Sequence, residues 1–125
     1  MSDYAYMLEK GEGIPKNSSE AIRYYKMAID KGDTSAMNGY AFMLKLGEGI
    51  PKNSSEAARY FKMAIDKGNT SAMNNYAYML EKGEGIPKNS SEAVRYYKMA
   101  IEKGNKSAMG RYESIINEWP FISVT

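Results

Sequence analysis

The chain has 125 residues, of which 43% are hydrophobic and 26% are charged, and its net charge is +2. This balance is typical of a folded globular protein, and so small a net charge provides no strong field for attracting a polyanion. The sequence contains no cysteine and no histidine, which excludes disulfides, thiolate nucleophiles, zinc–thiolate sites and histidine as a general base. We therefore expect a protein that is not an enzyme, with no catalytic residue, no cofactor and no metal.

The N-terminal residues MSDYAYMLEK lack the basic and apolar regions of a secretory signal. No run of about 18 apolar residues occurs in the sequence, so no membrane span is predicted. We expect a soluble protein with a cytoplasmic location and no membrane partner.

The segment GEGIPKNSSEA occurs three times, starting at Gly11, Gly47 and Gly83, and its period is therefore 36 residues. The first two units are identical at 29 of 36 positions. Residues 1–10 align with the end of a unit and predict a partial repeat. The three full units that follow are 11–46, 47–82 and 83–118.

Each unit contains two stretches with apolar residues at helical spacing. In the first, Met37, Tyr40, Ala41 and Leu44 form a stripe at i, i+3, i+4 and i+7. A glycine after this stretch ends the helix, and an asparagine begins the next helix as N-cap, with a glutamate three residues on as the reciprocal partner of a capping box. The predicted helices are 2–10, 18–31, 34–46, 54–67, 70–82, 90–103 and 106–118.

No single helix pair can bury its apolar stripe alone, whereas stacked pairs bury a continuous seam. The sequence therefore predicts an all-α fold, a right-handed α/α superhelix (solenoid) of about three and a half helix-turn-helix repeats that forms one domain over 1–125. Trp119 and Pro120 interrupt the repeat, and proline prevents further helix. We expect the tail 119–125 to cap the last helix, with Trp119 as a plug.

The spacing of small and apolar residues in one unit resembles the Sel-one-like repeat, a relative of the tetratricopeptide repeat. The family prefers Leu-Gly where Tyr40-Ala41 stand and Asp where Asn53 stands, but these substitutions keep size class or capping role. The resemblance implies paired antiparallel helices in a superhelix, and a role as an adaptor or scaffold that binds proteins. The pattern that carries it is Ala36-x3-Tyr40-Ala41-x2-Leu44-x2-Gly47-x-Gly49-Ile50-x2-Asn53-x3-Ala57-x2-Tyr60-x3-Ala64-Ile65-x2-Gly68-x3-Ala72.

The repeated loop GEGIPK is not a phosphate-binding loop. Such a loop needs four residues between its glycines and a Lys-Ser or Lys-Thr directly after the second glycine. Here the two glycines are one residue apart, and Lys16 is followed by Asn17. The loop is interpreted as a structural turn.

Positions at which the near-identical repeats differ indicate a binding surface. On the first helix of each pair they lie at i, i+3, i+6 and i+7, opposite the apolar stripe, so we expect this face to be exposed. In related solenoids the first helices line a concave groove, and exposed aromatic residues in a groove suit the binding of a peptide or helix. Neutral drift on a solvated face, or packing against the next unit, is the alternative. The predicted partner-binding residues are Asp3, Tyr6, Lys10, Gly39, Phe42, Leu46, Asn75, Tyr78, Lys82, Arg111 and Ser114.

The predicted function is thus a protein-interaction module that binds a peptide or helix of a partner protein in its concave groove. The alternative is a binder of an anionic polymer, nucleic acid or polysaccharide, along an edge with Lys16, Lys52 and Lys88. Glutamates interleave with these lysines, so no nucleic acid is expected. The first helix lacks the lead-in of its later copies, so we expect either a fragment of a longer array or an abrupt start. The open N-terminal end is expected either to self-associate, by packing against another copy of the chain, or to pack against a missing repeat.

Overall fold

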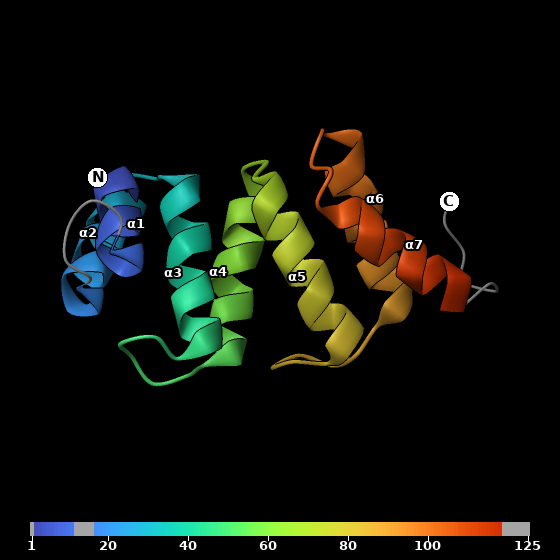
Figure 1. The fold of residues 1–125 in the computed structure, drawn as a ribbon, viewed down its shortest axis with the longest axis horizontal. Coiled ribbons are helices and arrows are strands. Elements are labelled where there is room, and N and C mark those ends of the chain that lie inside the picture. Colours follow the sequence, from blue (N-terminus) through green and yellow to red (C-terminus); the bar gives the residue numbers. More distant parts are fainter. Residues whose placement is uncertain (1, 12–16, 119–125) are drawn as a thin grey trace.

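The computed structural model describes residues 2–11 and 17–118. In this part of the chain there are seven helices and no strand, and the helices stand side by side in a row from the α1–α2 pair to α7 (Figure 1). The predicted all-α superhelical repeat fold is confirmed. The predicted capping tail with Trp119 lies outside the described residues. The helices are α1 (Ser2–Lys10), α2 (Ser18–Asp30), α3 (Thr34–Leu46), α4 (Ser54–Asp66), α5 (Thr70–Lys82), α6 (Ser90–Glu102) and α7 (Ala108–Glu118).

The second helix of each pair begins at an asparagine cap, as predicted. The Asn53 side chain accepts a hydrogen bond from the Glu56 backbone N–H at 3.1 Å, and Asn17 and Asn89 do the same in α2 and α6. The reciprocal half of the capping box was predicted wrongly. The Asn53 N–H donates to the Leu44 carbonyl instead, which leaves the Glu56 carboxylate to pair with Arg59 on the helix surface.

Four predicted helix boundaries shift. The second helices end one residue earlier than predicted, because the backbone N–H groups of Lys31, Lys67 and Lys103 already close the helix as C-caps. The last helix begins at Ala108 instead of residue 106, since Asn105 accepts a hydrogen bond from Ser107 two residues on and so forms a turn rather than an N-cap. First helices end as predicted at Gly47 and Gly83, both in the left-handed conformation.

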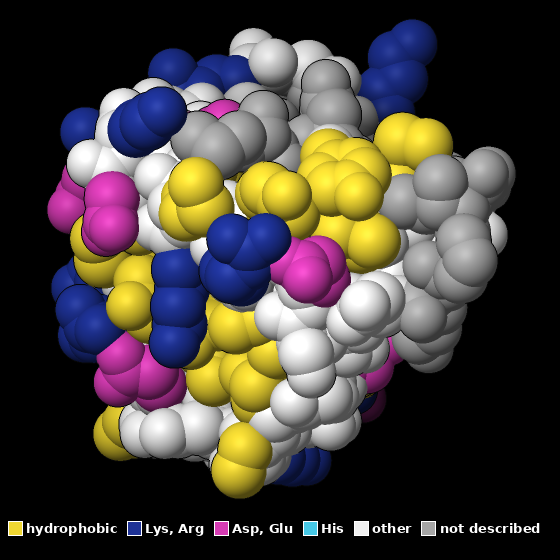
Figure 2. All heavy atoms as spheres, turned by 90° about the vertical axis from the view of Figure 1, so that its left-hand side faces the viewer, with side chains coloured by type: hydrophobic (Ala, Val, Ile, Leu, Met, Phe, Trp, Pro, Cys, Tyr) yellow, Lys and Arg dark blue, Asp and Glu magenta, His cyan; other side chains and the backbone are white. Residues whose placement is uncertain are grey.

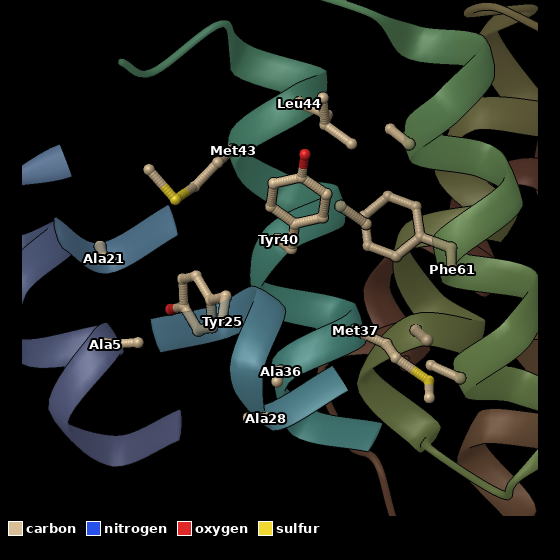
Figure 3. Packing of buried hydrophobic residues seen from close by; sticks show 14 of the residues in the cluster. Ala5, Ala21, Tyr25, Ala28, Ala36, Met37, Tyr40, Met43, Leu44 and Phe61 are labelled. Carbon is tan, nitrogen blue, oxygen red and sulfur yellow. The ribbon is translucent and has the colours of Figure 1, made fainter. Parts of the chain in front are cut away.

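The first helix of a pair is buried on two sides. Met37, Tyr40, Ala41 and Leu44 are buried, as the stripe predicts. In addition Met43 is fully buried and extends from α3 towards α2, while Phe61 reaches from α4 towards Tyr40 (Figure 3). Each inner first helix is therefore packed between the second helix of its own pair and that of the pair before it.

The three largest fully buried side chains are aromatic residues of the second helices. Tyr25, Phe61 and Tyr97 occupy the same position in successive repeats, and all three are buried. The residue before each of them is also a tyrosine: Tyr24 and Tyr60 are partly exposed, and Tyr96 is buried. Each of these three rings meets a first-helix tyrosine ring edge-to-face, with ring centres 4.9–5.2 Å apart. This edge-to-face geometry is the favoured one for aromatic pairs.

Two helical glycines differ in their surroundings. A Cβ atom at Gly39 in α3 would lie 2.7 Å from Cε1 and Cζ of Tyr25, whereas nothing lies within 4 Å of a Cβ atom at Gly110 in α7. The Tyr25 ring is buried and its hydroxyl is hydrogen-bonded to Glu9, so the ring has little freedom to retreat. Gly39 therefore permits the close approach of α2 and α3.

We expect Gly110→Ala to raise the free energy of unfolding by about 1 kcal/mol through helix propensity. Gly39→Ala gains the same propensity but overpacks the Tyr25 ring, so we expect it to be less stable than Gly110→Ala by about 1–3 kcal/mol. Urea denaturation followed by circular dichroism measures both. Equal changes in the two variants would contradict the tight packing at Gly39.

Candidate functional site

A pocket of about 470 Å³ opens on the side of the array formed by the first helices. Its walls come from α1, α3, α5 and the segment before α7, and from the tip of one second-helix side chain. We call this pocket, together with its continuation along the first helices, the groove. The pocket is lined by Tyr6, Glu9, Lys10, Tyr25, Ser35, Asn38, Gly39, Phe42, Asn69, Ser71, Asn74, Asn75, Asn105 and Ser107.

Five of the predicted binding residues line this pocket. They are Tyr6 and Lys10 from α1, Gly39 and Phe42 from α3, and Asn75 from α5. The structure thus brings together side chains that are 36 residues apart in sequence, because the repeat places equivalent positions of successive first helices on the same side.

Three more predicted residues meet along the continuation of the groove. The ring of Tyr78 has Lys45 Nζ at 4.4 Å and Arg111 Cζ at 4.1 Å from its centre, and Lys82 Nζ lies at 5.8 Å. Lys45 also approaches Phe42, and Lys10 approaches both Phe42 and Tyr6, at 5.7–5.9 Å from the ring centres. Rings and cations therefore alternate from α1 to α7. We call this set the cation–aromatic row; in spatial order it is Tyr6, Lys10, Phe42, Lys45, Tyr78 and Arg111.

The remaining predicted residues lie elsewhere. Leu46 is 52% exposed and does not line the pocket. Ser114 is exposed on α7 outside the pocket, and the side chain of Asp3 lies outside the described residues.

The expectation that this face is fully exposed was wrong in part. Phe42 is half-buried and packs against the core, and Lys45 and Tyr78 are half-buried as well. The reason is the second buried side of each first helix, which the sequence stripe did not reveal. Tyr6, at the end of the array, is 48% exposed.

A buried hydrogen bond joins the two helices of the first pair beneath the groove. The Tyr25 hydroxyl donates to Glu9 Oε1 at 2.8 Å, and Glu9 is only 2% exposed. The third pair repeats this arrangement, with the Tyr97 hydroxyl donating to Glu81 Oε1 at 2.9 Å. Burial raises the pKa of both tyrosines, so their hydroxyls stay protonated and act as donors.

The middle pair replaces both partners at once. Phe61 stands where the other pairs have tyrosine, and Lys45 stands where they have glutamate. A phenylalanine offers no hydroxyl, so a glutamate at position 45 would lose its donor, and Lys45 instead lies over the Phe42 and Tyr78 rings. The two changes together remove a buried hydrogen bond and place a cation among the rings of the row.

Glu9 and Lys45 stand at equivalent positions, and different neighbouring groups shift their pKa values. Burial raises the pKa of Glu9 above its ordinary value of 4.5; the Tyr25 hydrogen bond and Lys10 lower it, and Glu48 from the loop after α3 raises it. Burial lowers the pKa of the Lys45 ammonium, and the charge of Arg111 lowers it further, while Glu84 acts in the opposite direction.

Amide side chains supply the polar part of the pocket. Asn75 Nδ2 donates to Asn38 Oδ1 at 3.0 Å across α5 and α3. The Asn74 Oδ1 atom is buried and accepts no hydrogen bond from the described residues. Amides both donate and accept hydrogen bonds, so this wall matches the chemistry of a peptide backbone.

Several of these groups escaped the sequence interpretation. Tyr25 was assigned to the core alone, and Glu9, Ser35, Asn38 and Asn74 were not singled out. One signal was available: positions 16 residues apart change together, as Glu9 with Tyr25, Lys45 with Phe61 and Glu81 with Tyr97. Paired changes of this kind indicate contact between the two side chains.

The lysine edge of the alternative function does not join the groove. Lys52 and Lys88 are exposed in the loops before α4 and α6 and do not line the pocket, and Lys16 lies outside the described residues. Over residues 2–11 and 17–118, no group of three or more acidic side chains could hold a metal ion. No helix there is long and apolar enough to cross a membrane.

The sequence profile of the Sel1 repeat matches residues 1–33, 34–69 and 70–105, which together cover most of the chain. The chain belongs to the Sel1 repeat family. The profile divides the periodicity at the start of each first helix, so its three repeats correspond to α1–α2, α3–α4 and α5–α6. None of the curated proteins matches the sequence.

Solved structures have the same fold. A Sel1 repeat protein from Oxalobacter formigenes superposes with a TM-score of 0.83 at 26% identity over 98% of this chain, which spans about half (51%) of that protein. A protective antigen of uropathogenic Escherichia coli with an SLR fold gives a TM-score of 0.86 at 23% identity, covering 94% of this chain and 25% of the antigen. Cysteine rich protein B of Helicobacter pylori gives a TM-score of 0.71 at 21% identity, and the match covers 76% of this chain and 71% of that protein.

The raised pKa of Glu9 makes stability depend on pH. Between 4.5 and the raised value the folded state binds more protons than the unfolded state, so the free energy of unfolding falls as pH rises through this window. We expect Glu9→Gln to remove this slope and to be at least as stable as the parent at pH 7, because the amide oxygen still accepts from Tyr25.

Urea denaturation between pH 4 and 8 tests this prediction. Glu56→Gln serves as the control, because Arg59 lowers the pKa of Glu56. Removing the Glu56 carboxylate should therefore change the slope of the free energy of unfolding against pH in the opposite direction. A Glu9→Gln profile parallel to that of the parent would contradict the assignment.

Proposed function

We propose that the groove binds an extended or helical segment of a partner protein, and that the chain acts as a non-enzymatic adaptor scaffold. Sel1 repeat proteins generally serve as scaffolds for protein interactions. The observation that carries the proposal is the cation–aromatic row, in which partly exposed rings line a groove beside an amide-rich wall. Aromatic anchors in a partly desolvated groove are the residues that contribute most to peptide and protein binding.

The proposal is tested by selecting displayed random 12-residue peptides on the immobilised 125-residue protein. The variant Tyr6→Ser/Tyr78→Ser removes two rings that are not core anchors, and serine already stands at the position of Tyr78 in the last repeat as Ser114. We expect the selected peptides to bind this variant at least tenfold more weakly.

Arg59→Ser, on the surface of the second helix α4, is the matched control and should bind the peptides as the parent does. Circular dichroism checks that all variants remain helical. Selection of no peptide, or equal binding to the parent and the double variant, would refute binding in the groove.

We further propose that the α1–α2 end of the array self-associates with a second copy of the chain. Met7 is 36% exposed, whereas Met43 and Met79 at the same position of the later repeats are fully buried by the preceding pair. Tyr4 and Met27 are also exposed on this helix pair, and Figure 2 shows hydrophobic side chains gathered on this end of the molecule. This end of α1–α2 therefore exposes apolar residues at a position that, in the later pairs, the preceding pair covers.

Sedimentation equilibrium measures the association. We expect the parent to form dimers at micromolar to millimolar concentration and Met7→Lys to remain monomeric, because an ammonium on the covered face would be desolvated. Leu46→Lys introduces the same charge at an exposed leucine away from this end and should not change the association. A parent that is monomeric throughout this range would contradict the proposal.

A further inference from the structure

We propose that the segment recognised by the groove is an acidic, extended peptide whose carboxylates lie at Lys10, at Lys45 and at Arg111. This inference rests on the proposed function, since it names the chemistry of the segment that the groove takes. It follows from which charges of the groove are used within the fold and which are presented to a ligand.

Of the cations of the row, Lys10 lines the pocket, and Lys45 and Arg111 lie over one aromatic ring. Lys45 Nζ and Arg111 Cζ are 4.4 and 4.1 Å from the centre of the Tyr78 ring. Neither forms an ion pair with any carboxylate of the described residues, although Arg111 also has a side-chain hydrogen bond with Tyr97. The charge of Arg111 acts to lower the pKa of Lys45, so the two cations repel each other, and an anion close to either of them relieves that repulsion.

Two nearby carboxylates are already engaged within the fold. Glu9 is buried, accepts from Tyr25 and lies 3.4 Å from Lys10 Nζ. Glu81 accepts from Tyr97 and lies 3.7 Å from Lys82 Nζ. A third carboxylate, Glu84, acts to raise the pKa of Lys45 but forms no ion pair with it. A ligand at the row therefore meets ammonium and guanidinium groups together with aromatic rings.

Lys45 is the residue that makes the groove cationic. At the same position Glu9 and Glu81 point back to a tyrosine hydroxyl, whereas Phe61 leaves Lys45 without such a partner. Burial lowers the pKa of its ammonium, so an incoming carboxylate also offsets a cost of desolvation that the free protein bears.

The spacing of the row suits an extended chain. Lys10 lies between rings of α1 and α3, and Lys45 between rings of α3 and α5. An extended peptide that crosses α1, α3 and α5 in turn would therefore reach Lys10 first and Lys45 next, while Asn38, Asn74 and Asn75 bind the peptide backbone.

A uniform polyanion fits these features less well. The cations of the row alternate with rings, whereas Lys52 and Lys88, which could follow a regular phosphate or sulfate backbone, lie in the loops before α4 and α6. A peptide supplies carboxylates at intervals and apolar side chains for the rings between them. Binding of an anionic polymer is accordingly an outcome that the experiment must distinguish.

The experiment uses peptides selected from the random 12-residue library on the full chain. We expect Asp and Glu to be enriched in them relative to the starting library. Synthetic copies in which Asn and Gln replace the acidic residues should bind about tenfold more weakly by fluorescence anisotropy.

Two variants use residues that sister repeats already carry at the same position, which keeps the fold intact. Lys45→Glu takes the residue of Glu9 and Glu81, and Arg111→Asn takes that of Asn75. Each variant should bind the acidic peptides about tenfold more weakly than the parent does. Lys62→Glu makes the same charge change on the exposed surface of α4 and should leave binding unchanged.

The outcomes separate this inference from the proposed function. If the binding of the selected peptides depends on Tyr6 and Tyr78 but the peptides are not enriched in acidic residues, the inference is overturned. The proposed function, peptide binding in the groove, then still stands. Failure to select any peptide would refute the proposed function itself. Labelled heparin and oligothymidylate test the anionic polymer. If either binds the parent more tightly than the peptides do, and this binding disappears in the Lys45→Glu variant, the inference is overturned in favour of an anionic polymer.

Discussion

Burial of the first helices on two sides is the constraint on which the rest of this structure depends. Met43 and Met79 are fully buried only because a preceding helix pair covers them, and the same position at the end of the array leaves Met7 partly exposed. A helix pair on its own has two apolar sides and can cover only one of them. The stack therefore supplies the stability that a single 36-residue unit lacks, and it aligns the first helices into the wall of the groove.

Core and groove are chemically connected through position 45 and its equivalents. Where the second helix carries a tyrosine, the hydroxyl requires an acceptor, and a glutamate turns inward to provide it. Where the second helix carries Phe61, that requirement disappears and a lysine lies among the groove rings. Loss of one hydroxyl in the core thus accompanies a change in the sign of a charge on the face of the first helices. Near-identical repeats can in this way present different chemistry without altering the backbone.

Position 39 and its equivalents have different contacts in successive repeats. Gly39 accommodates the Tyr25 ring, which Glu9 holds in place. The equivalent Asn75 hydrogen-bonds to Asn38 of the preceding first helix. The equivalent Arg111 acts on Tyr97 through its charge and a side-chain hydrogen bond. The chemistry of this face therefore changes from repeat to repeat.

Periodicity and local chemistry determined most of the fold from the sequence alone. The 36-residue repeat, the apolar stripe of Met37, Tyr40, Ala41 and Leu44, the asparagine caps and the terminating glycines are all local signals, because spacing along one helix and hydrogen bonds within one turn depend on neighbouring residues. Only the tertiary structure decided the second buried side with Met43, the pairing of Glu9 with Tyr25 and the half-buried state of Phe42 and Lys45. These depend on which helix lies against which, and a contact between helices leaves no periodic trace within either one.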